Sequence, residues 1–238
     1  AAIRYSSPVQ IPGTTWDSIT SNSYTALATR TDGTLWSWGE NKMGTLGLNQ
    51  AIATYISSPT QIPGTTWSSV HIGSTIVTAI KTDNTLWKWG NNGTGDLGQN
   101  NTTKYSSPVQ VPGTTWSNIV WGEYIALARK TDGTLWQWGQ GLYATNDTVH
   151  RSSPTQIGTN TNWSNNIAAN KYHGAATKTD GTLWAWGRAS GGVLGMNTTE
   201  DGGLFISSPI QVGTDTIWSQ ERNAVTIGAK GLFVLKKF

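Results

Sequence analysis

The sequence predicts an all-β fold, a five-bladed β-propeller with four short strands in each blade. Three observations support this prediction. One motif recurs five times at intervals of about 50 residues, which is within the range of propeller blades. Each copy contains short alternating runs bounded by Gly, Pro, Asn and Asp, a pattern typical of strands and turns. No stretch of useful length has the period of an amphipathic helix, so essentially no helix is expected.

The first anchor of the repeat is a turn followed by a tryptophan-rich strand, T-D-G-T-L-W-x-W-G. It begins at Thr31, Thr82, Thr131 and Thr179, with a weaker copy around Gly231. We expect its Asp-Gly pair to form a two-residue hairpin turn in which both central positions have positive φ. Asn84 replaces the glycine in one copy and tolerates that conformation. Side chains alternate along a strand, so Trp36 and Trp38 share one face.

The second anchor is S-S-P-x-Q, which leads each time to another tryptophan. It begins at Ser6, Ser57, Ser106, Ser152 and Ser207, and the tryptophans are Trp16, Trp67, Trp116, Trp163 and Trp218. We expect S-S-P-x-Q to form the third strand of a blade and the residues after the tryptophan to form the fourth. The loop before it often carries G-x-L-G, at 44–47, 95–98 and 192–195, but the segment 142–151 lacks this motif.

The phase of the repeat predicts how the ring closes. The chain starts with third and fourth strands and ends with first and second strands. We therefore expect one domain over residues 1–238, whose last blade combines residues 1–20 with residues 221–238. A β-solenoid is the competing architecture, but its rungs usually repeat at about half this length or less. Four-stranded units favour the propeller, in which radial repetition leaves only short sheet edges.

Composition excludes several classes of function. Charged residues make up 12% of the chain, the net charge is +3, and Lys and Arg are scattered, so no nucleic-acid surface is indicated. There is no cysteine, which excludes disulfides and thiolate metal sites. No apolar stretch approaches the roughly 18 residues of a membrane span, so membrane insertion is not expected.

The residues that could carry catalysis have simpler structural explanations. The recurrent aspartates precede the turn glycine or asparagine in separate blades, too far apart to act as a catalytic pair: Asp32, Asp83, Asp132 and Asp180. His71, His150 and His173 fall at different phases of the repeat, which does not indicate a metal site or a catalytic triad. The glycine-rich loops lack the Lys-Ser/Thr of a phosphate-binding loop. We expect no enzyme activity, no metal and no cofactor.

At these motifs the sequence resembles the regulator of chromosome condensation repeat family. The residues that carry the resemblance are Ala26-Leu27, Asp32-Gly33, Leu35-Trp36, Trp38-Gly39, Gly44–Gly47 and Pro59–Ile62. The resemblance implies a β-propeller. The best-known members have seven blades, whereas five repeats occur here, and no protruding insertion of the kind an exchange factor uses against its GTPase is evident. The Asn/Thr/Ser/Gly-rich style is also similar to propellers of bacteriophage virion proteins and bacterial surface proteins.

Positions that vary within the constant frame are the candidate recognition surface, because loops on a rigid scaffold carry recognition. Where the family often has His before the first strand, this chain has Tyr24, Thr75, Tyr124, Tyr172 and Arg222. After W-G stand Glu40, Asn91, Gln140 and Arg188, and between the two tryptophans stand Ser37, Lys88, Gln137 and Ala185. Neutral drift at solvated positions is the competing interpretation.

Tryptophans add one further candidate. The eight in the L-W-x-W motifs are expected to fill the space between neighbouring sheets, with a sugar-stacking surface as the alternative. Trp121 has no Trp equivalent in the other repeats and is a candidate for an exposed binding residue.

These observations predict a non-catalytic binding or structural module. A component of a virion appendage or cell-surface assembly that mediates protein or receptor contacts is the favoured interpretation, with a virion or extracellular location rather than a cytoplasmic one. A carbohydrate-binding propeller with one shallow site per blade is the alternative. An exchange factor for a small GTPase is the least favoured.

Overall fold

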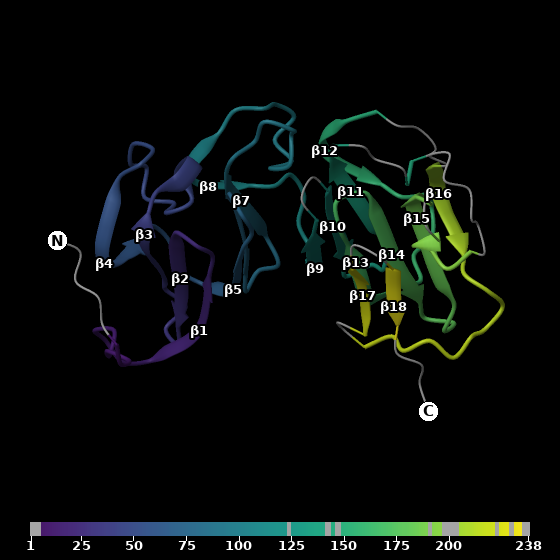
Figure 1. Ribbon diagram of the computed structural model, residues 1–238, viewed down its shortest axis with the longest axis horizontal. Coiled ribbons are helices and arrows are strands. Elements are labelled where there is room, and N and C mark those ends of the chain that lie inside the picture. The colour runs from purple at the N-terminus through teal and green to yellow at the C-terminus, as the bar shows by residue number, and fades with distance from the viewer. Residues whose placement is uncertain are drawn as a thin grey trace.

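The computed structural model is all-β and describes residues 6–122, 125–140, 144–145, 149–189, 192–196, 205–221, 224–228 and 231–234. These residues form four antiparallel sheets of four strands each, followed by a two-stranded sheet (Figure 1). Within each four-stranded sheet, strands that follow one another in the chain are hydrogen-bonded neighbours. The recurring motif therefore builds one antiparallel meander after another, as the sequence predicts.

The first sheet contains β1 (Trp16–Ser21), β2 (Thr25–Arg30), β3 (Leu35–Glu40) and β4 (Tyr55–Ile62). The second contains β5 (Trp67–Ile72), β6 (Ile76–Lys81), β7 (Leu86–Gly90) and β8 (Tyr105–Gln110). The third contains β9 (Trp116–Trp121), β10 (Ile125–Lys130), β11 (Leu135–Gly139) and β12 (Arg151–Gln156). The fourth contains β13 (Trp163–Ala169), β14 (His173–Lys178), β15 (Leu183–Arg188) and β16 (Phe205–Gln211). The short fifth sheet pairs β17 (Val225–Gly228) with β18 (Gly231–Val234). A 3-10 turn, η1 (Lys42–Gly44), lies in the loop between β3 and β4.

The phase of the repeat differs from the expected one. The strand that starts at the recurrent tryptophan begins a new sheet instead of ending the previous one, so that Ser21 of β1 lies opposite Ala26 of β2. The S-S-P-x-Q strand is the last strand of its sheet, with Gln61 opposite Trp36. The connection between these strands crosses to the next sheet, where the Trp67 N–H donates to the carbonyl of Gly33 in the preceding hairpin turn at 3.0 Å.

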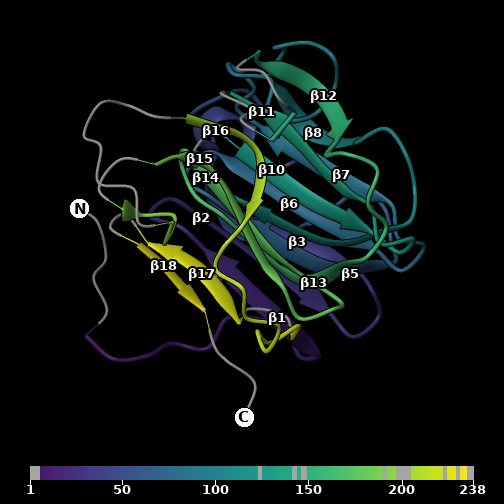
Figure 2. The same ribbon diagram turned by 90° about the vertical axis from the view of Figure 1, so that its right-hand side faces the viewer.

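The expected closure of the last blade by residues 1–20 and 221–238 is not seen in the described part of the chain. Residues 6–15 contain no strand there, and the strand expected to join the C-terminal residues, β1, pairs with β2 instead. Among the described residues β18 has β17 as its strand partner. The β17–β18 pair lies beside the fourth sheet (Figure 2), where the Val225 N–H donates to the Asn166 side-chain oxygen at 2.7 Å.

The hairpin turns also differ from the prediction. The Arg30 N–H donates to the Thr34 carbonyl at 3.0 Å, so the loop contains three residues, Thr31 to Gly33, and not two. Only the last of them has positive φ, 78° at Gly33 and 61° at Asn84. A type I turn closed by one left-handed residue has this geometry and matches the twist of the flanking strands. The tolerance predicted for Asn84 is confirmed.

The core lies between successive sheets and repeats from one junction to the next. In the first junction, Leu27, Leu35 and Ile62 of the first sheet pack against Trp67, Val70, Val77, Ala79 and Trp89 of the second, all at most 5% exposed. The second and third junctions repeat the arrangement around Trp116 and Trp138, and around Trp163 and Trp186. Burial of these large side chains provides most of the driving force for stacking the sheets.

The two tryptophans of L-W-x-W have different environments. The second is buried at 0–1% exposure at Trp89, Trp138 and Trp186, which confirms its predicted place in the core. The first is half-buried and packs edge-on against the tryptophan that opens the sheet, with Trp87 and Trp67 5.9 Å apart between ring centroids. A cation covers the pair, since the Lys81 ammonium lies 4.6 Å from the Trp87 ring. Trp36, Trp136 and Trp184 repeat this stack.

Candidate functional site

The structure places the variable residues in pairs at one end of three hairpins. In each pair, the N–H of the residue after W-G donates to the carbonyl of the residue that precedes the second strand of the sheet. Its N···O distance is 2.8 Å from Glu40 to Tyr24, 2.9 Å from Asn91 to Thr75 and 3.1 Å from Arg188 to Tyr172. The variable position after W-G and the variable position before the second strand are therefore neighbours in these three sheets. Gln140 is half-buried, while Tyr124 and Arg222 lie outside the described residues.

The glycine of W-G makes this pairing possible. Its φ is 106° at Gly39 and 107° at Gly90 and Gly187, a region that favours glycine. A Cβ at Gly39 would lie 2.3 Å from the Tyr24 carbonyl oxygen, closer than any real contact. The recurrent glycine thus bends the end of the strand, and the main-chain N–H of the next residue reaches its hairpin partner. Because this contact uses only the main chain, the side chain of that next residue can vary.

Asparagine side chains hold the loops that carry these residues. The Asn22 carbonyl oxygen accepts from the N–H groups of Tyr24 and Thr25 at 2.9 and 2.8 Å. The Asn22 amide also donates to the carbonyls of Gly73 and Ser74 at 3.0 Å, which ties the first sheet to the second. A side chain that satisfies both loops rigidifies the surface on which the variable residues stand.

Cations lie beside two tyrosine rings of this surface. The Lys42 ammonium lies 3.8 Å from the centroid of the Tyr24 ring, and Tyr24 is 44% exposed. Around Tyr172, the Lys171 ammonium lies at 5.4 Å and the Arg188 guanidinium at 6.0 Å. These contacts orient both rings by cation–π attraction and leave hydroxyl groups and guanidinium N–H groups for a partner.

A pocket of about 250 Å³ between the second and third sheets brings three predicted residues together. Thr75, Asn91 and Trp121 line it, together with Asp96. Trp121, the candidate for an exposed binding residue, ends β9 and is half-buried, with its ring centroid 5.3 Å from that of His71. The packing of the third sheet on the second brings Trp121 next to the hairpin end that carries Thr75 and Asn91, so its ring lines the pocket. This contact between two sheets cannot be read from the sequence.

Beneath this pocket lies a buried ionisable pair that sequence reasoning missed. Lys88 is 1% exposed and Asp96 is 5% exposed. Burial lowers the pKa of Lys88 to about 8, although the Asp96 carboxylate acts in the opposite direction. Burial also raises the pKa of Asp96, against the lowering effects of a Thr94 hydrogen bond and the Lys88 charge. The signal available in the sequence was a lysine between two core tryptophans.

The variable position between the tryptophans is therefore not part of a recognition surface. Ser37, Lys88, Gln137 and Ala185 are all at most 1% exposed. These side chains face the junction core, where Ser37 and Lys88 donate to carbonyls of the G-x-L-G loops at 2.7 and 2.5 Å. The Gln137 side-chain oxygen accepts from the Trp186 indole N–H at 3.0 Å, whereas Ala185 contributes only apolar packing.

Neither clustered metal-ligating groups nor an apolar spanning helix occurs among the described residues. Among the described residues no three of His, Cys, Asp and Glu are close enough together to hold a metal ion. The described helical residues include no segment long and apolar enough to cross a membrane. The groups that the surface does present are aromatic faces, amides and cations held on a rigid frame.

Comparison with known proteins agrees with this architecture. The family model "Regulator of chromosome condensation (RCC1) repeat" matches residues 32–80 and 83–128. These two segments of the chain carry RCC1 repeats. The matched segments of these RCC1 repeats contain Thr75, Asn91 and Trp121, so the pocket between the second and third sheets is built from them. No curated protein matches the chain significantly.

Solved structures show the same RCC1-like propeller fold. Human WBSCR16 is 21% identical with a TM-score of 0.72, over 93% of this chain and 58% of that one. Saccharomyces cerevisiae Prp20p, described with its binding properties to Gsp1p and histones, is 18% identical with a TM-score of 0.70, over 94% of this chain and 57% of that one. Yeast RCC1 (Prp20), in complex with Kap60, is 18% identical with a TM-score of 0.70, over 95% and 56%. The RCC1-repeat chain thus spans less than two thirds of the length of these structures.

Proposed function

We propose that the chain is a non-catalytic protein-binding module and that the paired residues at the hairpin ends form its recognition surface. The observation that carries the proposal is the side-by-side placement of variable residues on a constant frame, as at Tyr24 with Glu40 and Tyr172 with Arg188. Protein is the favoured ligand class because structures of this fold are described with protein partners, Gsp1p, histones and Kap60.

The chemistry of the surface suits a protein partner. Tyr and Arg are enriched among the residues that dominate binding energies in protein interfaces. Tyr24 and Tyr172 are already oriented by neighbouring cations, so less conformational entropy is lost when they bind. A place in a virion appendage or a cell-surface assembly is part of the same proposal. Several hairpin ends held on one frame would allow the module to contact a neighbouring protein of such an assembly at more than one point.

A closed five-bladed ring is the architecture that we propose for the module. Ile19 of β1 is 64% exposed, whereas Val70 and Ile119 at the same repeat position are 5% and 4% exposed inside their junctions. Ile11, Trp16 and Ile19 line an apolar hollow of about 290 Å³ on the outward face of the first sheet. A sheet completed by the C-terminal strands would cover this face. Closure predicts that Ile19→Asp lowers the free energy of unfolding as much as Val70→Asp does; an unchanged stability would argue for an open array.

Site-specific photo-cross-linking tests the recognition surface. A photoreactive phenylalanine analogue at position 24 or 172 should cross-link one protein partner in extract from the native source. The same analogue at position 58, an exposed residue of β4, is the matched control. Tyr24→Ala combined with Tyr172→Ala should weaken the partner's binding about tenfold or more.

Three results would contradict the proposal. Equal cross-linking from position 58 would remove the surface from recognition. Binding on a glycan array that depends on Trp121 would favour the carbohydrate-binding alternative. Accelerated nucleotide release from a small GTPase would identify an exchange factor.

A further inference from the structure

An asparagine side chain satisfies the turn between the first two strands of the first sheet. The Asn22 carbonyl oxygen accepts from the N–H groups of Tyr24 and Thr25 at 2.9 and 2.8 Å. In the fourth sheet the carbonyl oxygen of Asn170 accepts from the N–H groups of the two corresponding residues at 3.1 and 3.0 Å. A carboxamide is therefore the group with which this chain binds the two N–H donors of the turn.

In the second sheet glycine stands in the place of this asparagine. The Gly73 N–H donates to the Ile76 carbonyl at 2.8 Å. The Asn22 N–H donates to the Thr25 carbonyl in the same way at 3.0 Å, so the two turns correspond. Because Gly73 has no side chain, the N–H groups of Thr75 and Ile76 lack the acceptor that the asparagine provides. In the described part of the chain they have no other side-chain or loop acceptor, which leaves two neighbouring donors for a ligand.

The pocket of about 250 Å³ between the second and third sheets lies at these two donors. Thr75 and Ile76 belong to its lining, and Trp121 lines it from the third sheet. The Trp121 indole N–H also has no acceptor among the described residues. A Cβ placed on Gly73 would lie 3.2 Å from the indole nitrogen. Three N–H donors therefore surround the place that an asparagine side chain occupies in the first sheet.

Acceptors for an NH2 group also line the pocket. In the first junction the Asn22 amide donates to the Gly73 carbonyl of the next sheet at 3.0 Å. Gly122 corresponds to Gly73 in the third sheet, since its N–H donates to the Ile125 carbonyl at 2.8 Å. Asp96 is a further lining residue, and one of its carboxylate oxygens is buried without a hydrogen-bond partner among the described residues. An NH2 group in the pocket can therefore donate to the Gly122 carbonyl or to this carboxylate.

We propose that this pocket binds the carboxamide side chain of a glutamine or asparagine of the partner protein. Its oxygen accepts from the N–H groups of Thr75 and Ile76, and its NH2 group donates to the Gly122 carbonyl, as the chain's own asparagine does in the first junction. An apolar side chain would leave these donors unpaired. A carboxylate would meet Asp96, the one formally charged residue of the lining. The inference rests on the proposed function, because it assigns the residue that the hairpin end of the second sheet receives from its protein partner.

Peptide titration measures the preference for a carboxamide. The capped peptide Gly-Gln-Gly, added to the ¹⁵N-labelled full chain, should give saturable shifts of the Trp121 indole signal and of the Thr75 and Ile76 amide signals. Half-saturation is expected at about 10 mM, as for a small ligand with few hydrogen bonds. Methionine in place of the glutamine has a similar shape but no amide, so it should weaken binding about tenfold. Glutamic acid should also weaken binding, because of Asp96.

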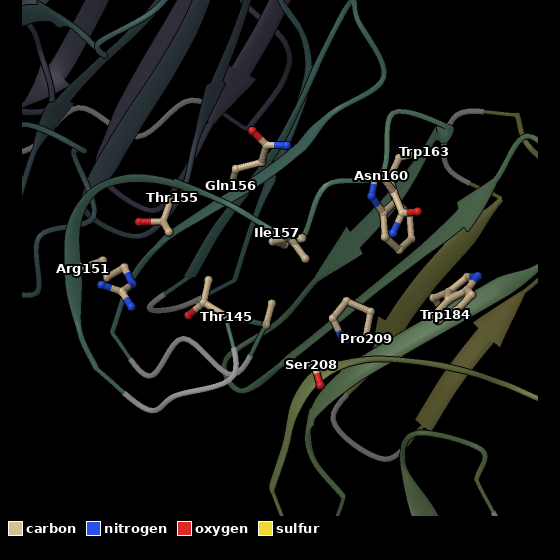
Figure 3. Close-up of a pocket in the computed structure, with 12 residues that line it drawn as sticks. Thr145, Arg151, Thr155, Gln156, Ile157, Asn160, Trp163, Trp184, Ser208 and Pro209 are labelled. Carbon is tan, nitrogen blue, oxygen red and sulfur yellow. The ribbon is translucent and has the colours of Figure 1, made fainter.

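Trp184 supplies the internal control. It lines a separate pocket of about 410 Å³ between β12 and β16, where Figure 3 shows it with Pro209 on the side opposite Gln156. Its indole N–H already donates to the Thr182 hydroxyl at 2.8 Å. A carboxamide that binds at the proposed site should therefore move the Trp121 indole signal and leave the Trp184 indole signal in place.

Two variants of the chain locate the site. Gly73→Asn supplies the carboxamide from within and should abolish the peptide-induced shifts at Thr75 and Ile76. The matched control Gly73→Ala adds a Cβ without an amide and should retain them. Trp121→Phe keeps an aromatic wall but removes the indole donor, so it should weaken binding of the glutamine peptide about threefold and leave that of the methionine peptide unchanged. This second variant decides the question if Gly73→Asn does not fold.

The proposal is overturned if about 50 mM glutamine peptide leaves the Trp121 signal in place, since that concentration reveals even weak binding. It is also overturned if the methionine peptide binds equally well, or if a folded Gly73→Asn chain responds like the original. Shifts caused by N-acetylglucosamine and not by the glutamine peptide would identify a glycan site instead. Successful cross-linking from positions 24 and 172 with a failed titration would remove only the carboxamide site, whereas failed cross-linking with a positive titration would count against the recognition surface alone.

Discussion

The Lys88 ammonium donates to the main-chain oxygen of Asp96 at 2.5 Å, in the interior between the second and third sheets. Lys88 thus links β7 to the loop that follows it. In the first repeat the Ser37 hydroxyl makes the corresponding link, because it donates to the Leu46 carbonyl at 2.7 Å. Removing an ammonium from water costs more than one such hydrogen bond returns. The Asp96 carboxylate offsets part of that cost, which makes the two residues one coupled unit.

Exchange of this pair for neutral residues from other repeats should show the coupling. Lys88→Gln introduces the residue found at Gln137 and leaves the buried Asp96 carboxylate without its cation. We expect a loss of about 3 kcal/mol of unfolding free energy. Adding Asp96→Thr, the residue found at Thr45, should restore at least the original stability in urea unfolding. A double variant as unstable as Lys88→Gln alone would show that the pair is not energetically coupled.

Stability should increase at alkaline pH because of Lys88. Its pKa is about 8 in the folded chain, below the value of 10.5 for an exposed lysine. Between these values the unfolded chain binds more protons than the folded chain, so the free energy of unfolding rises from about pH 8 to about pH 10.5 and is level below about pH 8. The full difference corresponds to about 3 kcal/mol. Urea unfolding across this range should show the rise in the original chain, and a Lys88→Gln chain that shows it equally would exclude Lys88 as its origin.

The turn aspartates should make the fold acid-sensitive. The Asp132 carboxylate accepts from the Thr134 N–H at 2.9 Å and from its hydroxyl at 2.7 Å, and that hydroxyl accepts from the Trp136 indole at 2.8 Å. The hydrogen bonds from Thr134 lower the pKa of Asp132, and the same arrangement recurs at Asp32, Asp83 and Asp180.

This contribution to stability is present above the ordinary aspartate pKa of 3.8 and is lost as pH falls through the lowered values. Melting temperatures measured as pH falls below about 4 should therefore decrease less steeply for Asp132→Asn than for the original chain. Thr134→Val should raise the pKa of Asp132 in an NMR titration and cost about 1 kcal/mol of stability. An Asp132 pKa that is unchanged in Thr134→Val would contradict the relay.

Gly174 should not tolerate a methyl group. A Cβ there would lie 2.3 Å from the Trp186 ring, although Ala126 occupies the same repeat position one sheet earlier. We expect Gly174→Ala to lower the unfolding free energy by about 1–3 kcal/mol, because the buried ring has no space to move. The reverse change Ala126→Gly is the matched control and should cost about 1 kcal/mol. Equal effects of the two changes would show that Trp186 can repack.

Local rules explain what could be predicted. Alternation placed Trp89 and Trp138 in the core, and a positive φ at the turn accounts for Asn84. The two-residue turn was wrong because the position before Gly33 keeps a negative φ and a third residue completes the loop. The phase of the strands was wrong because the Trp67 strand is fixed by a hydrogen bond to the hairpin of the preceding sheet, a contact between segments far apart in sequence.

The sequence by itself determined the repeated four-stranded sheets, the tryptophan core and the positions that vary within a constant frame, because strand alternation, turn chemistry and periodicity act over a few residues. Only the tertiary structure decided which variable residues meet. It placed Tyr24 beside Glu40 at a hairpin end and buried Lys88 with Asp96 between the second and third sheets. Those outcomes depend on how one sheet stacks on the next, and the space between two sheets belongs to neither repeat alone.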